Sequence, residues 1–122
     1  LDVVIAVNYG GRWDIVSACR RIVKMAVEGA LAPEDISEET LSRLTSLYPT
    51  RDPDLFIRTG GELRMSNFLL WQAAYSELYF TDTLWPDFDD HCFDRAIDAF
   101  RSRHRRFGQT GEQVLSGNSR GG

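Results

Sequence analysis

The residues with the clearest chemical potential lie in one stretch, Arg58 to Asn67, which reads RTGGELRMSN. Its two arginines can present planar guanidinium groups to phosphate oxygens, and a serine hydroxyl can add a further hydrogen bond. The paired glycines let a ligand approach the main chain. Ser66 precedes an apolar run that we expect to form a helix, whose first N–H groups favour an anion. The stretch therefore predicts a site of diphosphate size.

A structural interpretation accounts for the same residues equally well. Arg58 would then pair with a carboxylate such as Asp54 or Glu62, and Ser66 would serve only as a helix cap. The sequence contains neither a P-loop nor the glycine pattern of dinucleotide-binding folds, so it gives weak support to nucleotide binding.

Other polar residues leave two interpretations open. The stretch Asn8–Arg12 (NYGGR) could meet a ligand or form a tight turn with a surface arginine. Glu77, between Tyr75 and Tyr79, could be a paired acid of the core or a Mg²⁺ ligand completed by phosphate oxygens. Neither histidine has a nucleophile beside it in a recognisable arrangement, so a triad hydrolase is not supported.

The elements that position these residues repeat the order strand, glycine pair, helix. The apolar run Val3–Val7 predicts a strand buried on both faces of a parallel sheet, ending at Gly10–Gly11. Apolar residues at helical spacing then predict an amphipathic helix from Arg12 to about Glu28, packed on the sheet. Asp54–Arg58 predicts a second buried strand, ending at Gly60–Gly61. Because ligands of doubly wound folds bind beyond the carboxyl ends of the strands, we expect both glycine turns at that edge.

The remaining chain predicts two further helices and a strand. Ser37 is typical of an N-cap, Ser66–Ser76 reads as a short buried helix, and Leu78–Phe80 as a final strand. Acidic residues after Pro86 open a last helix with an arginine-rich end. Its expected inward face is Phe93, Ala96, Ile97 and Phe100. Residues 109–122 are rich in glycine and polar residues and predict a disordered tail.

Composition narrows the class of protein. A chain of 122 residues with 43% hydrophobic residues predicts one globular domain. The net charge of −4 disfavours a nucleic-acid-coating role, although local anion recognition stays open. Thirteen of the 14 basic residues are arginine, which suits bidentate phosphate contacts and is explained equally well by coding bias.

Cysteine usage and hydropathy predict the compartment. We expect Cys19 and Cys92 to be buried reduced thiols, because each lies on the apolar face of a predicted helix. No run approaches the roughly 20 apolar residues of a membrane span, and no leader is evident. These features predict a cytoplasmic protein without a transmembrane segment.

Three segments together carry a resemblance to a known family. IRTGGELRMSNFLLWQAAYSELYF at 57–80, NYGGRWDI at 8–15 and WPDF at 85–88 resemble the carboxyl-terminal half of cis-prenyltransferases of the undecaprenyl diphosphate synthase type. The resemblance covers residues 1–108 and implies an α/β fold with a parallel sheet flanked by helices. It also implies repeated cis-condensation of isopentenyl diphosphate onto an allylic diphosphate such as farnesyl diphosphate, with Mg²⁺ required.

The resemblance also implies roles for individual residues. Isopentenyl diphosphate would be held by Arg58, Arg64 and Ser66, with main-chain contacts from Met65. Glu77 matches the family's metal-linked glutamate. The motif Arg106-Phe107-Gly108 matches an arm that reaches the paired subunit, which implies a homodimer whose product is released at the membrane surface as a cell-wall lipid carrier.

Departures from the family pattern concern the rest of the active site. Leu63 stands where some relatives carry histidine, so any contribution of that histidine to metal or phosphate binding is lost. The amino-terminal block, with its phosphate loop and Mg²⁺-organising aspartate, is absent, so no catalytic residue can be assigned and we expect this chain alone to be inactive. Two alternatives stay open: a non-catalytic partner subunit of the same fold, or a nucleotide-binding α/β domain.

Overall fold

The computed structural model describes residues 1–104, which divide into two compact units. Unit 1 comprises Leu1–Asp54 and Arg64–Ser76, and unit 2 comprises Leu55–Leu63 and the chain from Glu77 onward. None of the helices within residues 1–104 has the length and apolar character needed to span a membrane. The expected tail at 109–122 lies outside the described residues and stays a prediction.

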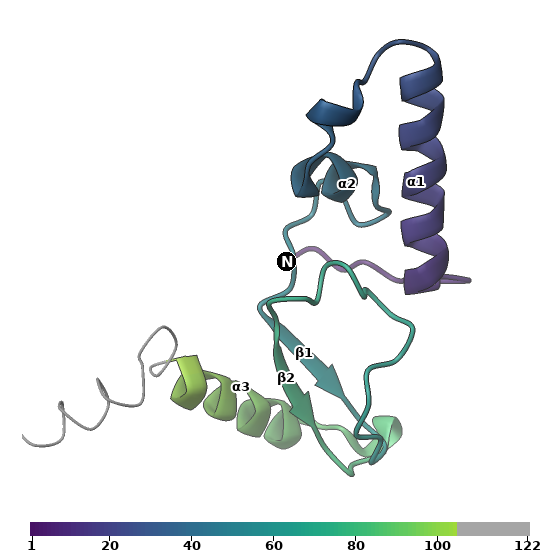
Figure 1. The fold of residues 1–122 in the computed structure, drawn as a ribbon. Helices are drawn as coiled ribbons and strands as arrows, with labels where there is room; N and C mark the ends of the chain where they lie inside the picture. Colours follow the sequence, from purple (N-terminus) through teal and green to yellow (C-terminus); the bar gives the residue numbers. More distant parts are fainter. Residues whose placement is uncertain (105–122) are drawn as a thin grey trace, which may run out of the picture. The chain divides into compact units, whose positions relative to one another are not determined.

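Unit 1 is built on the helix α1 (Gly11–Val27), which lies beside the short helix α2 (Glu38–Leu44) (Figure 1). A 3₁₀ turn at Pro33–Asp35 precedes α2. The main chain turns away after α1 at Gly29, where φ is +75°, a conformation that glycine adopts without the steric penalty of a side chain. The predicted helix from Arg12 to about Glu28 is therefore confirmed.

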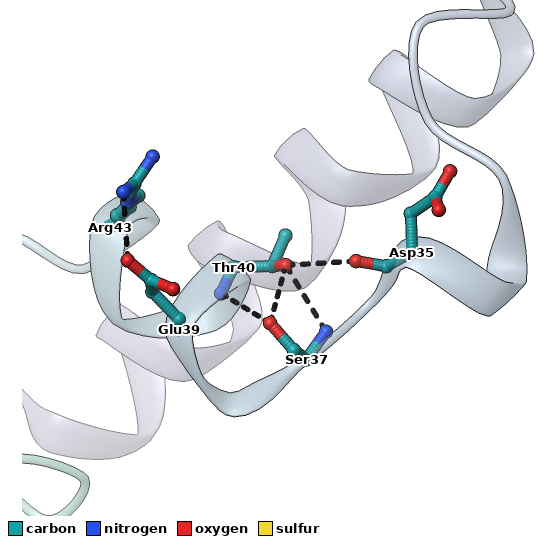
Figure 2. A network of polar contacts seen from close by, with 5 residues as sticks. All are labelled: Asp35, Ser37, Glu39, Thr40 and Arg43. Carbon is teal, nitrogen blue, oxygen red and sulfur yellow. Dashed lines mark hydrogen bonds and ion pairs between the residues drawn. The ribbon is translucent and has the colours of Figure 1, made fainter.

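A network of polar contacts fixes the start of α2 (Figure 2). The Ser37 hydroxyl accepts from the Thr40 N–H at 3.2 Å, and the Ser37 N–H donates to the Thr40 hydroxyl at 3.1 Å. The Thr40 hydroxyl also donates to the Asp35 carbonyl, and Arg43 pairs with Glu39 at 2.7 Å. A helix this short has few internal hydrogen bonds, so its capping contacts matter more. The prediction of Ser37 as N-cap is confirmed.

Unit 2 contains the parallel strands β1 (Leu55–Arg58) and β2 (Glu77–Phe80), which lie side by side in Figure 1. A 3₁₀ turn at Trp85–Asp87 leads to α3 (Asp90–His104), which contacts β2. The buried side chains of this unit include Phe56, Cys92 and Ala96. Both strands occur where the sequence predicts them, and the parallel sheet flanked by a helix agrees with the expected α/β class.

The predicted first strand is not present. Residues Val3–Val7 have no regular secondary structure, and their side chains are exposed, with Val3 at 75% and Ile5 at 81%. The described residues of unit 1 include no strand with which this run could pair. Because a strand needs a neighbour for its N–H and C=O groups, the apolar run alone cannot form one.

The apolar face of α1 is exposed, although the sequence predicts that it packs on a sheet. The apolar residues Val16, Val23 and Val27 of α1 are exposed, and Cys19 with them, because unit 1 offers no sheet on which they could pack. The predicted burial of Cys19 is thus wrong, whereas that of Cys92 is confirmed.

The inward face of α3 agrees with the predicted one except at Phe93, which is 48% exposed. Ala96 is buried, as is Cys92 one turn before it, and Ile97 and Phe100 are half-buried. The buried stripe therefore follows small side chains, which allow a close approach of the helix to its neighbours.

Candidate functional site

Arg58 ends β1, where a glycine turn begins. The Thr81 N–H donates to the Arg58 carbonyl at 2.9 Å and so extends the pairing beyond β2. Gly60 and Gly61 have φ of +84° and +78°, a left-handed conformation that favours glycine. The turn thus leaves Arg58 at the carboxyl edge of the sheet, as the sequence predicts.

The amides of this turn are already used within the protein. The Gly60 N–H donates to the Thr83 carbonyl at 2.9 Å, and the Gly61 N–H donates to the Thr81 carbonyl at 3.0 Å. At Gly60 no described protein atom lies within 4 Å of the position that a Cβ would take, so a ligand could approach. It would find no amide hydrogen from Gly60 or Gly61 to bind. These two amides therefore do not contribute to phosphate binding at this turn.

Arg64, Met65 and Ser66 lie in unit 1, in a segment without regular secondary structure. Arg64 and Met65 are exposed and Ser66 is half-buried. The predicted helix Ser66–Ser76 is wrong: the segment consists of bends and turns, and Leu69 interrupts it with a φ of +46°. No helix N-terminus is therefore available at Ser66, and the Arg64 guanidinium and the Ser66 hydroxyl remain as the candidate anion-binding groups of this segment.

Glu77 and Arg58 occupy opposite ends of the two-stranded sheet. Glu77 pairs in register with Leu55, and Arg58 pairs with Phe80. Three residues of strand separate the two levels, about 10 Å at roughly 3.3 Å per residue. The backbone positions of Glu77 and Arg58 are therefore at different levels of the sheet in unit 2. Arg106 and Gly108 lie outside the described residues.

Glu77 faces a basic neighbour on α3. Its Oε2 lies 4.0 Å from Nη1 of Arg103, which donates to the Leu78 carbonyl at 2.7 Å. Within residues 1–104 no cluster of three His, Cys, Asp or Glu side chains could hold a metal ion. Because Mg²⁺ in phosphate sites commonly uses one or two carboxylates with phosphate oxygens, Glu77 fits as a single ligand and not as a complete site.

The first glycine pair, Gly10–Gly11, packs against the 64–76 segment of unit 1. The Gly11 N–H donates to the Asn67 carbonyl at 2.8 Å, and the Arg12 N–H donates to Asn67 Oδ1 at 2.9 Å. A Cβ at Gly10 would lie 3.0 Å from Asn67 Nδ2, and one at Gly11 would lie 2.7 Å from Leu70 Cγ. The turn at Asn8–Arg12 is therefore a close packing contact with an exposed Arg12, which agrees with the second interpretation of this stretch.

Asp14, in the first turn of α1, is the centre of a buried hydrogen-bond network that the sequence does not predict. Its side chain is 1% exposed. Oδ1 accepts from the N–H and the hydroxyl of Ser46 at 2.9 and 2.8 Å, and Oδ2 accepts from Tyr9 at 2.9 Å and Gln72 Nε2 at 3.2 Å. Asp14 thus joins α1 to the residues after α2 and to the 64–76 segment.

The network shifts the pKa of two of its members. Burial acts to raise the pKa of Asp14, but the hydrogen bonds from Ser46, Tyr9 and Gln72 outweigh it and lower the pKa below the ordinary value of 3.8. Burial, together with the hydrogen bond to Asp14, raises the pKa of Tyr9 to about 12. The carboxylate is therefore ionised and the phenol neutral at neutral pH. Ser46 and Gln72 are 32 and 58 residues from Asp14, so no local pattern could identify the network.

Comparison with known proteins identifies the family of this chain. Residues 1–108 match the model of the undecaprenyl diphosphate synthase family. The chain belongs to this family. It is 56% identical over 110 residues to the (2E,6E)-farnesyl-diphosphate-specific ditrans,polycis-undecaprenyl-diphosphate synthase of Yersinia pseudotuberculosis, covering 90% of this chain and 44% of that protein. It is 57% identical over 117 residues to an isoprenyl transferase of Ralstonia nicotianae, covering 96% of this chain and 45% of the relative.

A solved structure supports the same family. Lavandulyl diphosphate synthase from Lavandula x intermedia, in complex with dimethylallyl diphosphate, matches with a TM-score of 0.76 and 45% identity. The match covers 79% of this chain and 42% of that one. The chain thus spans less than half the length of these relatives, and the predicted family membership and α/β fold are confirmed.

Proposed function

We propose that this chain supplies the isopentenyl diphosphate-binding half of a polyprenyl diphosphate synthase of the undecaprenyl type. The whole enzyme would condense isopentenyl diphosphate with an allylic diphosphate such as farnesyl diphosphate in the cis geometry. The observation that carries the proposal is the retention of Arg58, Arg64 and Ser66 in a chain that matches the family over residues 1–108. These are the side chains that residue type makes candidates for a diphosphate and to which the family resemblance gives that role.

The proposed contacts rest on charge-assisted hydrogen bonds. Arg58 and Arg64 each offer a planar set of N–H donors to diphosphate oxygens, and Ser66 offers a hydroxyl. Because the Gly60 and Gly61 amides donate to Thr83 and Thr81, Arg58 and not these two amides would bind phosphate beside this turn. A fixed diphosphate would hold the alkene of isopentenyl diphosphate toward the allylic carbon, which lowers the entropic cost of the reaction.

Glu77 is the proposed metal-linked carboxylate of this half. Mg²⁺, when bound, would stabilise the negative charge that develops on the leaving diphosphate. Glu77 would supply one oxygen ligand, with Arg103 beside it to limit the motion of the carboxylate. The remaining ligands would come from phosphate oxygens, water and a carboxylate outside these 122 residues.

The assembly and location form part of the same proposal. Arg106 and Gly108 would belong to an arm that contacts the diphosphate of a second subunit in a homodimer. The enzyme would act in the cytoplasm and release a lipid carrier for cell-wall synthesis at the membrane surface. Inactive chains should then complement each other in trans when subunits exchange.

Incubation of this chain with and without the missing half tests the proposed function. With Mg²⁺, farnesyl diphosphate and labelled isopentenyl diphosphate, the chain alone should give no polyprenyl product, because the main seat of the allylic diphosphate is absent. Addition of the amino-terminal half should restore product. Product from the chain alone would contradict the proposed division of roles. No product from a folded complex of both halves would favour a non-catalytic subunit.

A further inference from the structure

We propose that Asn67 is a positioning residue for the diphosphate-binding segment, through its two hydrogen bonds to the start of α1. This inference rests on the proposed function, since it concerns the placement of Arg64 and Ser66. Asn67 directly follows Ser66, so its position limits where the serine hydroxyl and the nearby guanidinium can lie. Asn67 is exposed and contributes little to a core, which separates its role from that of a packing residue.

The contact at Asn67 uses both oxygens of the residue. Its carbonyl accepts from the Gly11 N–H at 2.8 Å, and its Oδ1 accepts from the Arg12 N–H at 2.9 Å. The first N–H groups of a helix have no partner within the helix and carry a partial positive charge. Asn67 satisfies two of them and is thereby fixed in both position and orientation.

A second group of contacts holds the later part of the same segment. Gln72 donates to Asp14 at 3.2 Å, and Trp71 Nε1 donates to the Ser42 hydroxyl at 2.8 Å. The Ser76 hydroxyl donates to the Pro53 carbonyl. Because the segment has no regular secondary structure, contacts to α1, α2 and the Pro53 carbonyl add to internal hydrogen bonds such as the one from the Ala73 N–H to the Leu69 carbonyl at 2.8 Å. Asn67 is the contact that lies next to the proposed ligand-binding residues.

Gly10, which precedes the two amides that donate to Asn67, has little room for a side chain. A Cβ at Gly10 would lie 3.0 Å from Asn67 Nδ2, closer than ordinary van der Waals contact. Gly10 has a φ of −139°, which any residue adopts, so backbone conformation does not require glycine there. A Cβ there would instead force the Asn67 side-chain amide to shift by a few tenths of an ångström. A substitution at Gly10 therefore disturbs Asn67 without removing its side chain.

The test compares substrate binding by Asn67→Ala and Ser76→Ala in the full-length synthase. Asn67→Ala should weaken isopentenyl diphosphate about three- to tenfold, the range that one net hydrogen bond represents, with much less change for an unreactive allylic diphosphate analogue. Ser76→Ala removes one hydrogen bond from the same segment and should leave both affinities unchanged. Gly10→Ala should repeat the selective loss to a smaller extent. Calorimetric titration gives the affinities and a thermal melt gives the stability.

The outcomes separate this inference from the proposed function. If Arg64→Ala weakens isopentenyl diphosphate while Asn67→Ala and Gly10→Ala do not, Asn67 is not a positioning residue and the proposed function stands. If Asn67→Ala lowers the melting temperature only, or weakens both substrates equally, its role is structural and the inference is overturned. If Arg64→Ala itself has no effect on isopentenyl diphosphate, the proposed function and the inference both fail. If Asn67→Ala does not fold, Gly10→Ala decides the question by the same selectivity.

Discussion

The two glycine pairs of this chain look alike in sequence and differ in structure. Gly10–Gly11 has little space: side chains there would meet Asn67 and Leu70. Gly60–Gly61 has left-handed backbone angles, and no described atom lies within 4 Å of a Cβ at Gly60. The first pair is glycine because the protein packs against it, and the second because its backbone conformation requires it. A glycine pair after a predicted strand therefore does not by itself indicate a ligand.

The difference also separates the roles of the neighbouring residues. Near the first pair, Asp14 and the start of α1 bind the 64–76 segment of unit 1. Near the second pair, the amides close a turn onto Thr81 and Thr83 and leave Arg58 at the sheet edge. The first turn therefore has a structural role, and the proposed substrate contact lies at Arg58, before the second pair.

Loss of the Asp14 carboxylate should have the largest effect on stability. Asp14→Ala removes the buried acceptor of four donor groups, which we expect to lower the free energy of unfolding by about 3–5 kcal/mol. Asp89 offers a matched control, because it also accepts an amide hydrogen bond, from Cys92 at 2.9 Å, but is exposed. Urea unfolding of Asp89→Ala should show a much smaller change. Equal losses would remove the special role of the Asp14 network.

The same network predicts a pH dependence of stability. The pKa of Asp14 in the folded protein is lower than its ordinary value of 3.8, so the unfolded chain binds the proton first as the pH falls. The stabilising contribution is complete well above pH 3.8 and is lost as the pH falls through the folded pKa. Asp14→Asn should therefore have a flatter acid limb of stability against pH than the unsubstituted protein. An unchanged acid limb would contradict the lowered pKa.

Gly11→Ala tests the packing role of the first turn. In an exposed helix this change usually gains about 0.5–1 kcal/mol, because alanine is the better helix former. Here the new Cβ would lie 2.7 Å from Leu70 Cγ and 3.1 Å from the Leu70 nitrogen. We expect a loss of about 1–3 kcal/mol instead, as for other overpacked sites. A gain in chemical denaturation would show that the contact is loose.

At Gly60 the backbone conformation, and not the space for a side chain, should determine the cost of a substitution. Alanine at a φ of +84° should cost about 1–2 kcal/mol, although there is room for its Cβ. Asparagine visits left-handed angles more readily, so Gly60→Asn should cost less than Gly60→Ala. At Gly11, where space is limiting, asparagine should cost more than alanine. If urea unfolding gave the same order of alanine and asparagine losses at both positions, it would contradict the proposed difference between the two turns.

Local patterns predict the local elements of this chain. The apolar spacing of α1, the Ser37 cap of α2 and the short apolar runs of β1 and β2 all depend on neighbouring residues, and all are confirmed. The diphosphate site stays a proposal, and its candidate residues come from residue type, since arginine pairs and a serine near a glycine turn suit phosphate.

Elements that depend on distant contacts were not predictable in this way. The apolar run Val3–Val7 has the composition of a strand, but in the described part of unit 1 it has no partner. Ser66–Ser76 has the composition of a helix, but Asn67 and Gln72 bond to α1 and Leu69 takes a left-handed angle. Both errors come from long-range hydrogen bonding, on which local composition gives no information.

The most direct test of the central claim is the affinity of the full-length synthase for its two substrates after Arg58→Ala and Arg64→Ala. Charge-assisted hydrogen bonds to phosphate contribute about 1.5–3 kcal/mol each, so each change should weaken isopentenyl diphosphate roughly tenfold or more. Affinity for the allylic diphosphate should change far less. Calorimetric titration of both ligands would measure this selectivity. Equal loss for the two substrates, or no loss for isopentenyl diphosphate, would contradict the assignment of these arginines to its diphosphate.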